Sequence, residues 1–333
     1  MELRNIAAYQ VNKNTLGVID ADYTSFALQD VSIPKKWAGT GEQLSEELQL
    51  SGTASGTHLK WTVGGYFEYD RPTDTPEFDV AELAAVAPGE YLPIKVVVQG
   101  ATTQRSRAVY GQTVYDFGGL SQSLQDVRLT TGLRYTWDTA TESSSIYIPT
   151  FGNVCVFTAG TAPECLLSPS GSWSAPTWTV ALDDQLTPQL LAYVTTRRGY
   201  KSGGFNLTTA LHAQDSTFGP EYVTDVEAGI KADWQLWSIS ARSNLDVFHS
   251  DYTDIQRTIV ANLNNISAPL TENVAGATIN GIELEQLFNV TARSEVSLSY
   301  SYLESRYDHF FSALSGDLTG RPFPYTPRNK VSV

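Results

Sequence analysis

The sequence predicts an all-β fold, a transmembrane antiparallel up-and-down β-barrel, and three observations support this prediction. Several segments alternate between apolar and polar residues over more than the roughly 5–6 residues of an ordinary strand. No stretch of similar length has a helical period, and none approaches the roughly 18 continuous apolar residues of a membrane-spanning helix. The connections between the alternating segments are long and short in turn, as in outer-membrane barrels.

Twelve strands are predicted from these alternations, because a strand with one apolar and one polar face has period two. In HLKWTVGGYFEY, for example, Leu59, Trp61 and Val63 lie on one face, and Lys60 and Thr62 lie on the other. In chain order, the strands are expected near residues 3–10, 43–51, 58–69, 105–117, 124–138, 173–183, 188–198, 222–234, 236–249, 278–289, 294–304 and 328–333.

The same division into two faces continues along the later strands. The apolar face is expected to carry Leu129, Leu133, Tyr135, Trp137, Val226, Ala228, Ile230, Ala232, Trp234, Ile282, Leu284, Phe288, Leu298, Tyr300 and Tyr302. The opposite face carries charged side chains that suit a hydrated lumen, namely Arg134, Glu227, Lys231, Arg242, Glu283 and Glu285. In a soluble sheet, the alternative, these charges would simply face water.

The connections distinguish the barrel from a soluble sandwich. Long ones are expected near 11–42, 70–104, 139–172, 199–221, 250–277 and 305–327, and short ones at SGTASGT, DDQLT and VTAR. In an up-and-down sheet, this order places every long loop at one end and every tight turn at the other. A Greek-key sandwich is not expected to sort its loops in this way, and irregular loops longer than ~15 residues are uncommon in compact soluble domains.

Composition excludes some classes of protein. The formal net charge of −14 argues against a nucleic-acid binder, which needs clustered lysine and arginine to displace counterions from phosphates. The chain has 7 Trp, 17 Tyr and 13 Phe, a mixture that suits the aromatic girdles of a membrane barrel. Such a chain does not resemble a protein held to an anionic membrane surface by positive charge.

The two cysteines, Cys155 and Cys165, lie in CVFTAGTAPEC, without the histidines or CxxC spacing of a zinc site. A disulfide that closes a loop is the first interpretation, and two unrelated thiols are the alternative. The start of the chain, MELRNIAAYQ, has no apolar region and is not a signal peptide. For an exported protein, the segment that directs export is therefore expected to be missing.

No pattern indicates an enzyme, a cofactor or a metal site. The sequence has no HExxH and no GxSxG motif. The histidines are scattered, at His58, His212, His249 and His309. Asp251 and Asp254 lie just past a predicted strand, where aspartate also suits a turn, so a structural role is favoured over acid-base chemistry or calcium binding.

One segment, LLAYVTTRRGYKSGGFN, combines a strand with a glycine-rich end. It is not a Walker loop, because Lys201 and Ser202 precede Gly203 and Gly204 and no helical pattern follows. It closely resembles a segment of TonB-dependent outer-membrane receptors. Seven further phrases agree with that family in the same order: SEELQLSG (45–52), WTVGGYFEYDRP (61–72), LTTGLRYTWD (129–138), FGPEYVTDVEAGIKADW (218–234), FHSDYTDIQ (248–256), NGIELE (280–285) and LTGRPFPYTPRNKVSV (318–333).

The resemblance, which is strongest to ferric-siderophore receptors, implies a function in TonB-dependent active uptake across the outer membrane of a Gram-negative bacterium. Such receptors have a signal peptide, a TonB box, a plug domain and a barrel of twenty-two strands. Residues 1–333 are accordingly expected to form a partial barrel domain of about twelve strands, without the plug or the C-terminal strands. The TonB complex would be contacted through regions absent from this chain. Charged residues of the lumen face would then contact the plug.

The resemblance also suggests candidate ligand contacts at the rim of the barrel, Arg197, Arg198 and Lys201, which would attract an anionic ferric complex. Alternatively, these cations face lipopolysaccharide phosphates or pair with loop carboxylates. Two other functions stay open at this point. One is a passive or substrate-specific outer-membrane porin, and the other is a soluble β-rich binding module.

Overall fold

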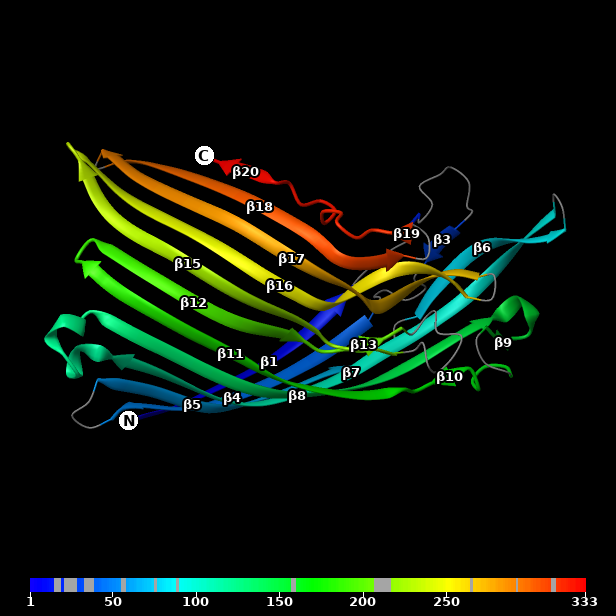
Figure 1. The fold of residues 1–333 in the computed structure, drawn as a ribbon. Coiled ribbons are helices and arrows are strands. Elements are labelled where there is room, and N and C mark those ends of the chain that lie inside the picture. The colour runs from blue at the N-terminus through cyan, green and yellow to red at the C-terminus, as the bar shows by residue number, and fades with distance from the viewer. Residues whose placement is uncertain are drawn as a thin grey trace.

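The computed structural model describes residues 1–14, 19–20, 29–32, 39–54, 58–74, 77–87, 90–156, 160–206, 217–263, 266–291, 293–312 and 316–333. His212 of the sequence analysis lies outside these ranges. A single antiparallel sheet, curved into a trough, makes up most of the described chain (Figure 1).

Twelve strands follow one another through this sheet, and each pairs antiparallel with the next. They confirm the twelve predicted strands. They are β1 (Glu2–Asn14), β4 (Gly39–Thr53), β5 (Leu59–Pro72), β7 (Glu90–Asp116), β8 (Val127–Ile148), β11 (Ser170–Thr187), β12 (Leu190–Lys201), β15 (Glu221–Leu236), β16 (Ile239–Leu263), β17 (Ile266–Thr291), β18 (Ser294–Ser312) and β20 (Asn329–Ser332).

The sheet is open. Within the described residues, β1 pairs only with β4 and β20 only with β18, so no ladder joins the first strand to the last. The two chain ends accordingly lie on opposite edges of the trough (Figure 1). The expectation of an unclosed up-and-down sheet is confirmed.

The ends of the strands differ as predicted. At one end, tight connections join neighbouring strands, including the short 3₁₀ turns η1 (Phe117–Gly119) and η2 (Gln122–Leu124) and the turn at Trp237, which has φ 53°. The other end, at the right of Figure 1, carries the short elements β2 (Ile19–Asp20), β3 (Gln29–Ser32), β6 (Glu77–Ala87), η3 (Pro149–Phe151), β9 (Val154–Cys155), β10 (Leu166–Leu167), β13 (Gly204–Phe205), β14 (Thr217–Phe218) and β19 (Gly316–Asp317).

Two of the segments predicted as irregular loops, 250–277 and 70–104, instead contain paired strands, so that prediction is wrong there. The segment 250–277 is a hairpin in which β16 and β17 stay paired from Ile255↔Ala275 to Leu263↔Ile266, after a bulge between Tyr252 and Ile255. In 70–104, β6 pairs with the first half of β7. These strands extend beyond the regular wall, where a bulge shifts the register and the alternation of apolar and polar residues fades.

A small apolar core lies at the long-loop end. It consists of Ile255, Ala275, Ala277, Tyr307 and Phe310, and Leu318 and Phe323 pack against it. In the described part of the chain, no helix is long and apolar enough to cross a membrane. Most of the described chain forms one layer of strands, so the two faces of that layer determine what the molecule contacts.

Candidate functional site

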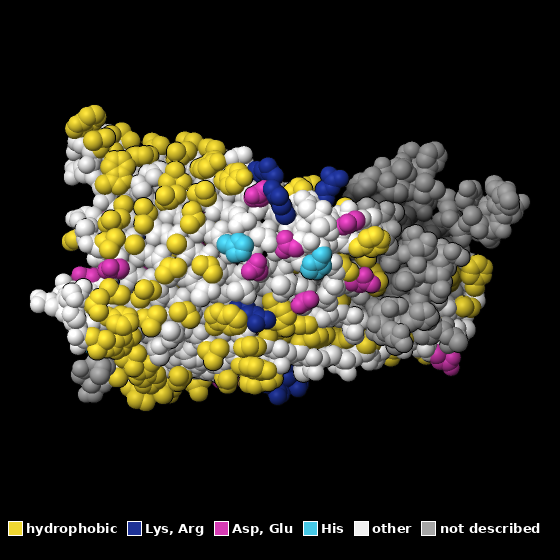
Figure 2. Space-filling model, in the orientation of Figure 1, with side chains coloured by type: hydrophobic (Ala, Val, Ile, Leu, Met, Phe, Trp, Pro, Cys, Tyr) yellow, Lys and Arg dark blue, Asp and Glu magenta, His cyan; other side chains and the backbone are white. Residues whose placement is uncertain are grey.

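The convex face of the sheet is apolar over the half nearest the tight turns. Its leucine, valine and isoleucine side chains are exposed, and Leu133 is 60% exposed. The set comprises Leu48, Val63, Val109, Leu133, Val180, Val194, Val226, Ile230, Val247 and Ile282. Figure 2 shows hydrophobic side chains gathered over this half of the face. Soluble monomers rarely expose a continuous apolar surface of this width, which suits contact with hydrocarbon.

This apolar surface ends abruptly on three neighbouring strands. On β16, β17 and β18, the next outward residues after Val247, Ile282 and Tyr302 are polar. They form an outer polar belt of His249, Asp251, Thr278, Asn280, Glu304, Arg306 and Asp308, which is linked by contacts between His249 and Asp251 (3.4 Å) and between Thr278 and Asp308 (2.9 Å). Figure 2 shows charged side chains and histidines beyond the apolar half of the face. The belt thus separates the apolar half of the convex face from the long-loop end.

The concave face carries a network of tyrosines and carboxylates. The Tyr110 hydroxyl donates to Glu47, and the Tyr193 hydroxyl donates to Glu227 at 2.7 Å. Tyr110 reaches Glu47 across the intervening strand β5 because that strand has a glycine there, and a Cβ at Gly64 would collide with the tyrosine ring. The Tyr110–Glu47 contact thus ties together two strands that are not neighbours, whereas the Tyr193–Glu227 contact joins the paired strands β12 and β15.

The lumen residues named from the sequence take part in this network or continue it. The Arg134 guanidinium carbon lies 5.1 Å from the centre of the Tyr66 ring, and the Lys231 ammonium lies 5.6 Å from that of Tyr193. The other named residues lie along the same wall. Glu283 is opposite Asp246, and Glu285 accepts a hydrogen bond from the Asn244 amide (3.1 Å). Near the tight turns, Arg242 donates to Asp233 (2.7 Å).

A shallow groove of about 690 Å³ crosses the middle of the concave face. It extends from β4 to β15, and its lining includes Glu47, Tyr110, Arg134, Arg197 and Asp225. The groove therefore mixes charges of both signs over the width of several strands, as expected for a wall that faces water or another polar protein surface.

The three candidate cations of the rim do not converge. Arg197 lies on the concave face and donates to Asp225 at 2.8 Å and to Glu227. Arg198, the next residue, stacks between Trp178 and Tyr222, with its guanidinium carbon 5.2 and 4.5 Å from the two ring centres. Lys201 forms an ion pair at 3.3 Å with Glu221, whose side chain is buried. Successive residues of a strand point to opposite faces, so the sequence cluster is divided in space.

The glycine-rich segment from the last residue of β12 through β13, Lys201–Phe205, which we call the lip, is held by residues distant in the sequence. The Gln256 amide donates to the carbonyls of Ser202 (2.8 Å) and Gly219 (2.9 Å), and the Gln256 backbone N–H donates to Glu221 at 2.7 Å. Gly203 lies so close to the Trp173 indole and the Phe218 carbonyl that a Cβ has no space. The glycines therefore allow close packing rather than phosphate binding.

Two asparagines complete the anchoring of the lip. Asn206 and Thr271 exchange two hydrogen bonds, from the Asn206 amide to the Thr271 carbonyl (2.7 Å) and from the Thr271 N–H to Asn206 (2.8 Å). Asn273 accepts from the Gly219 N–H and donates to the carbonyls of Gly219, Pro220 and Asp254. The phrases GYKSGGFN, FGPEY and DYTDIQ thus meet at one place, and Asn273 was not singled out from the sequence.

The acidic pair Asp251 and Asp254 is divided between two structural roles. Asp251 belongs to the outer polar belt, and Asp254 occupies the bulge of β16 with φ 54°. Within the described ranges, no group of three histidine, cysteine or carboxylate side chains is placed to hold a metal ion.

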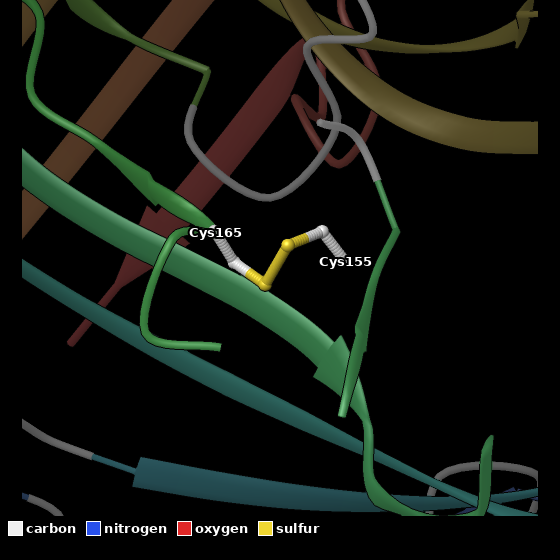
Figure 3. Close-up of a disulfide and its surroundings, with 2 residues drawn as sticks. All are labelled: Cys155 and Cys165. Carbon is white, nitrogen blue, oxygen red and sulfur yellow. A yellow bond between two sulfur atoms is a disulfide. The ribbon is translucent and has the colours of Figure 1, made fainter. Parts of the chain in front are cut away.

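The cysteines lie at the long-loop end, where β9 pairs with the end of β8. Cys155 and Cys165 form a disulfide with a Cα–Cα distance of 5.2 Å, and both side chains are buried (Figure 3). The bridge closes the loop that follows η3.

We expect this disulfide to be present in material isolated from cells, because an oxidising compartment keeps such a bridge formed. Peptide mapping by mass spectrometry without reductant should recover one linked peptide that contains Cys155 and Cys165. Quantitative alkylation of both thiols in the unreduced protein would contradict the expectation.

A single-layer antiparallel wall with an apolar convex face, a polar concave face and its long connections at one end defines the chain as a transmembrane β-barrel wall. The chain matches the family described as TonB dependent receptor-like, beta-barrel, over residues 2–333. It belongs to this family.

Solved structures with the same fold include three receptors. The ferric yersiniabactin uptake receptor FyuA from Yersinia pestis superposes with a TM-score of 0.67 and 16% identity, covering 99% of this chain and 43% of that one. The siderophore receptor PiuA from Acinetobacter baumannii superposes with a TM-score of 0.63 and 13% identity, covering 99% of this chain and 49% of that one. The ferric-catecholate import receptor Fiu from E. coli K12 superposes with a TM-score of 0.55 and 14% identity, covering 98% of this chain and 48% of that one. The chain spans less than half the length of each.

Proposed function

We propose that this chain is part of the barrel wall of an outer-membrane receptor that imports a scarce small ligand, with a ferric siderophore as the first candidate. The observation that carries the proposal is the family match over residues 2–333. It is supported by three solved receptors of the same fold that are described as ferric yersiniabactin, siderophore and ferric-catecholate receptors. The proposed protein is a transporter and not an enzyme.

The two faces of the sheet support a position in the outer membrane. The apolar convex half would lie in hydrocarbon, and the outer polar belt would meet the lipid head groups and lipopolysaccharide. The concave network would face a plug domain or water, and the long-loop end would face the outside and meet the ligand first. Among the candidate cations, Arg197 and Lys201 line hollows on the concave side, so we retain them as proposed ligand contacts. Arg198 lies on the convex side at the rim, so for this residue we propose the alternative, a contact with lipopolysaccharide phosphates.

Active uptake distinguishes the receptor from a porin, because only the receptor needs energy from the TonB complex. We expect cells that express the full gene to accumulate radioactive iron from a ferric siderophore under iron limitation, and cells that also lack TonB not to do so. Deletion of the gene alone should remove the same uptake.

The control is a small sugar or amino acid that diffuses through general porins. Its entry should not depend on the gene. Siderophore entry that persists without TonB would contradict the proposal and favour the porin, and no change in iron entry on deletion of the gene would favour a different ligand.

A further inference from the structure

A second hollow of about 550 Å³, which we call the upper pocket, lies beside the lip at the long-loop end of the concave face. One side is formed by carboxylates of β5 and β8, Glu68, Asp138 and Glu142. The other side is formed by the lip together with Trp173 and Phe218. The residues that line the pocket therefore bring acids and aromatic rings together.

Glu142 is the unusual member of this set. Its side chain is only 1% exposed, and one carboxyl oxygen, Oε2, accepts a hydrogen bond from the Thr102 hydroxyl. Within the part of the chain that the structure describes, the other oxygen, Oε1, makes no hydrogen bond of ordinary geometry, although the Ala101 backbone lies close enough to the carboxylate to favour its charged form. A buried carboxylate with an unused acceptor costs free energy, and such groups in native proteins call for an explanation. A donor on a bound ligand supplies one.

The charges around the pocket determine which donor is favoured. Of the cations that line it, Lys201 is already paired with Glu221 at 3.3 Å. The Arg105 side chain points to the convex face, where its guanidinium carbon lies 5.4 Å from the centre of the Tyr69 ring. Among the described residues, no cation forms an ion pair with Glu68, Asp138 or Glu142, so the local field favours a positive group. A neutral donor would leave that field unused.

The aromatic side of the pocket adds a second preference. The rings of Trp173 and Phe205 meet edge to face with centroids 5.8 Å apart. Aromatic faces next to carboxylates bind organic cations through both the ring quadrupole and ionic hydrogen bonds. The lip keeps the rings in place, because its backbone packs directly against Trp173 and Phe218.

We propose that the upper pocket binds a cationic nitrogen group, a primary ammonium or an amidinium, carried on an apolar or aromatic body, with Glu142 as its main hydrogen-bond acceptor. This inference rests on the proposed function in one respect, namely that a ligand enters from the long-loop end. It assigns to that ligand a positively charged portion, whereas the rim cations alone would suggest an anion.

The test uses the full receptor in detergent micelles and two matched probes, benzylamine and benzyl alcohol, which differ in charge but hardly in shape. Binding is measured by ligand-detected NMR titration. We expect wild-type protein to bind benzylamine about tenfold or more tightly than benzyl alcohol, because hydrogen bonds between charged groups are roughly twice as strong as neutral ones. Glu142→Gln should remove this preference by weakening benzylamine binding, while benzyl alcohol, whose hydroxyl can still donate to the amide oxygen, should continue to bind.

Retained benzyl alcohol binding shows that the Glu142→Gln pocket is still folded. The control variant is Glu295→Gln. Glu295 is an exposed carboxylate at the tight-turn end of β18, far from the long-loop end, so this variant should behave as wild type. Equal binding of the two probes by wild-type protein, or an undiminished preference for benzylamine in Glu142→Gln, would overturn the inference. Iron uptake by cells is a separate measurement, so a failure of the proposed function is recognised independently of cation binding.

Discussion

Replacement of Leu133 by arginine is expected to lower the free energy of unfolding by about 2–4 kcal/mol, the cost of an arginine on the lipid face near the bilayer midplane. Leu133 is 60% exposed on the convex face and lies opposite Gly111 and Trp178 on the neighbouring strands. Leu284, which lies between Leu245 and Tyr300 on β17, should respond in the same way. The measurement is denaturant unfolding of the full receptor in phospholipid vesicles.

The matched control is Thr130→Arg, three residues earlier on the same strand. Thr130 faces the concave side between Val114 and Ala181, where an arginine can reach water, so the cost should be much smaller. Thr136 shares that face but is buried beside Ala108 and Ala175 and has no space for arginine. Equal penalties at Leu133 and Thr130 would contradict the assignment of the two faces.

The strands and their faces were predictable because a period of two is a local property. Val226 and Ile230, assigned to the apolar face of one short segment, are both exposed on the convex side, and Glu227 between them joins the concave network. The alternation of long and short connections then determined the up-and-down order. Both signals act within a single strand or between neighbours, so no distant contact is needed to recognise them.

The hairpin of β16 and β17 was not predictable in the same way. Beyond the outer polar belt, neither face of these strands is defined by lipid, and Ile255 is buried in a small core with Tyr307 instead of alternating with polar neighbours. The bulge between Tyr252 and Ile255 also shifts the period by changing the register. A sequence window across it therefore resembles an irregular loop.

The candidate site was predictable only in its location. Arg197 and Arg198 are adjacent in sequence and on opposite faces in space, and the partner of Lys201 is Glu221 across a long connection. Glu142 lies in the polar run ATESSS, which was assigned to a loop, and nothing local indicates that it is buried. Cross-strand register decides these contacts, and register is not contained in any one segment.

Asn273 is the residue missed from the sequence whose loss should matter most at the lip. Its amide donates to the carbonyls of Gly219 (3.0 Å), Pro220 (3.2 Å) and Asp254 (2.7 Å), and its oxygen accepts from the Gly219 N–H at 2.5 Å. Asp254 has φ 54°, a conformation that costs free energy for a residue other than glycine. Asn273 thus joins the segment before β15 to a strained bulge in β16.

Asn273→Asp preserves the shape of the side chain but replaces the donor with a carboxylate oxygen that faces three carbonyls. We expect the free energy needed to open the lip and its anchors to fall by about 1–3 kcal/mol, the usual cost of leaving buried polar groups unsatisfied. Hydrogen exchange followed by mass spectrometry should then be roughly tenfold to hundredfold faster in peptides that cover 217–223 and 252–258, because 1.4 kcal/mol corresponds to a factor of ten. Asn289→Asp, at an exposed position near a tight turn, is the control and should leave exchange unchanged in those peptides.

If Asn273→Asp also leaves hydrogen exchange in those peptides unchanged, Asn273 does not hold the lip. In that case, Gln256 and Glu221 suffice to anchor it.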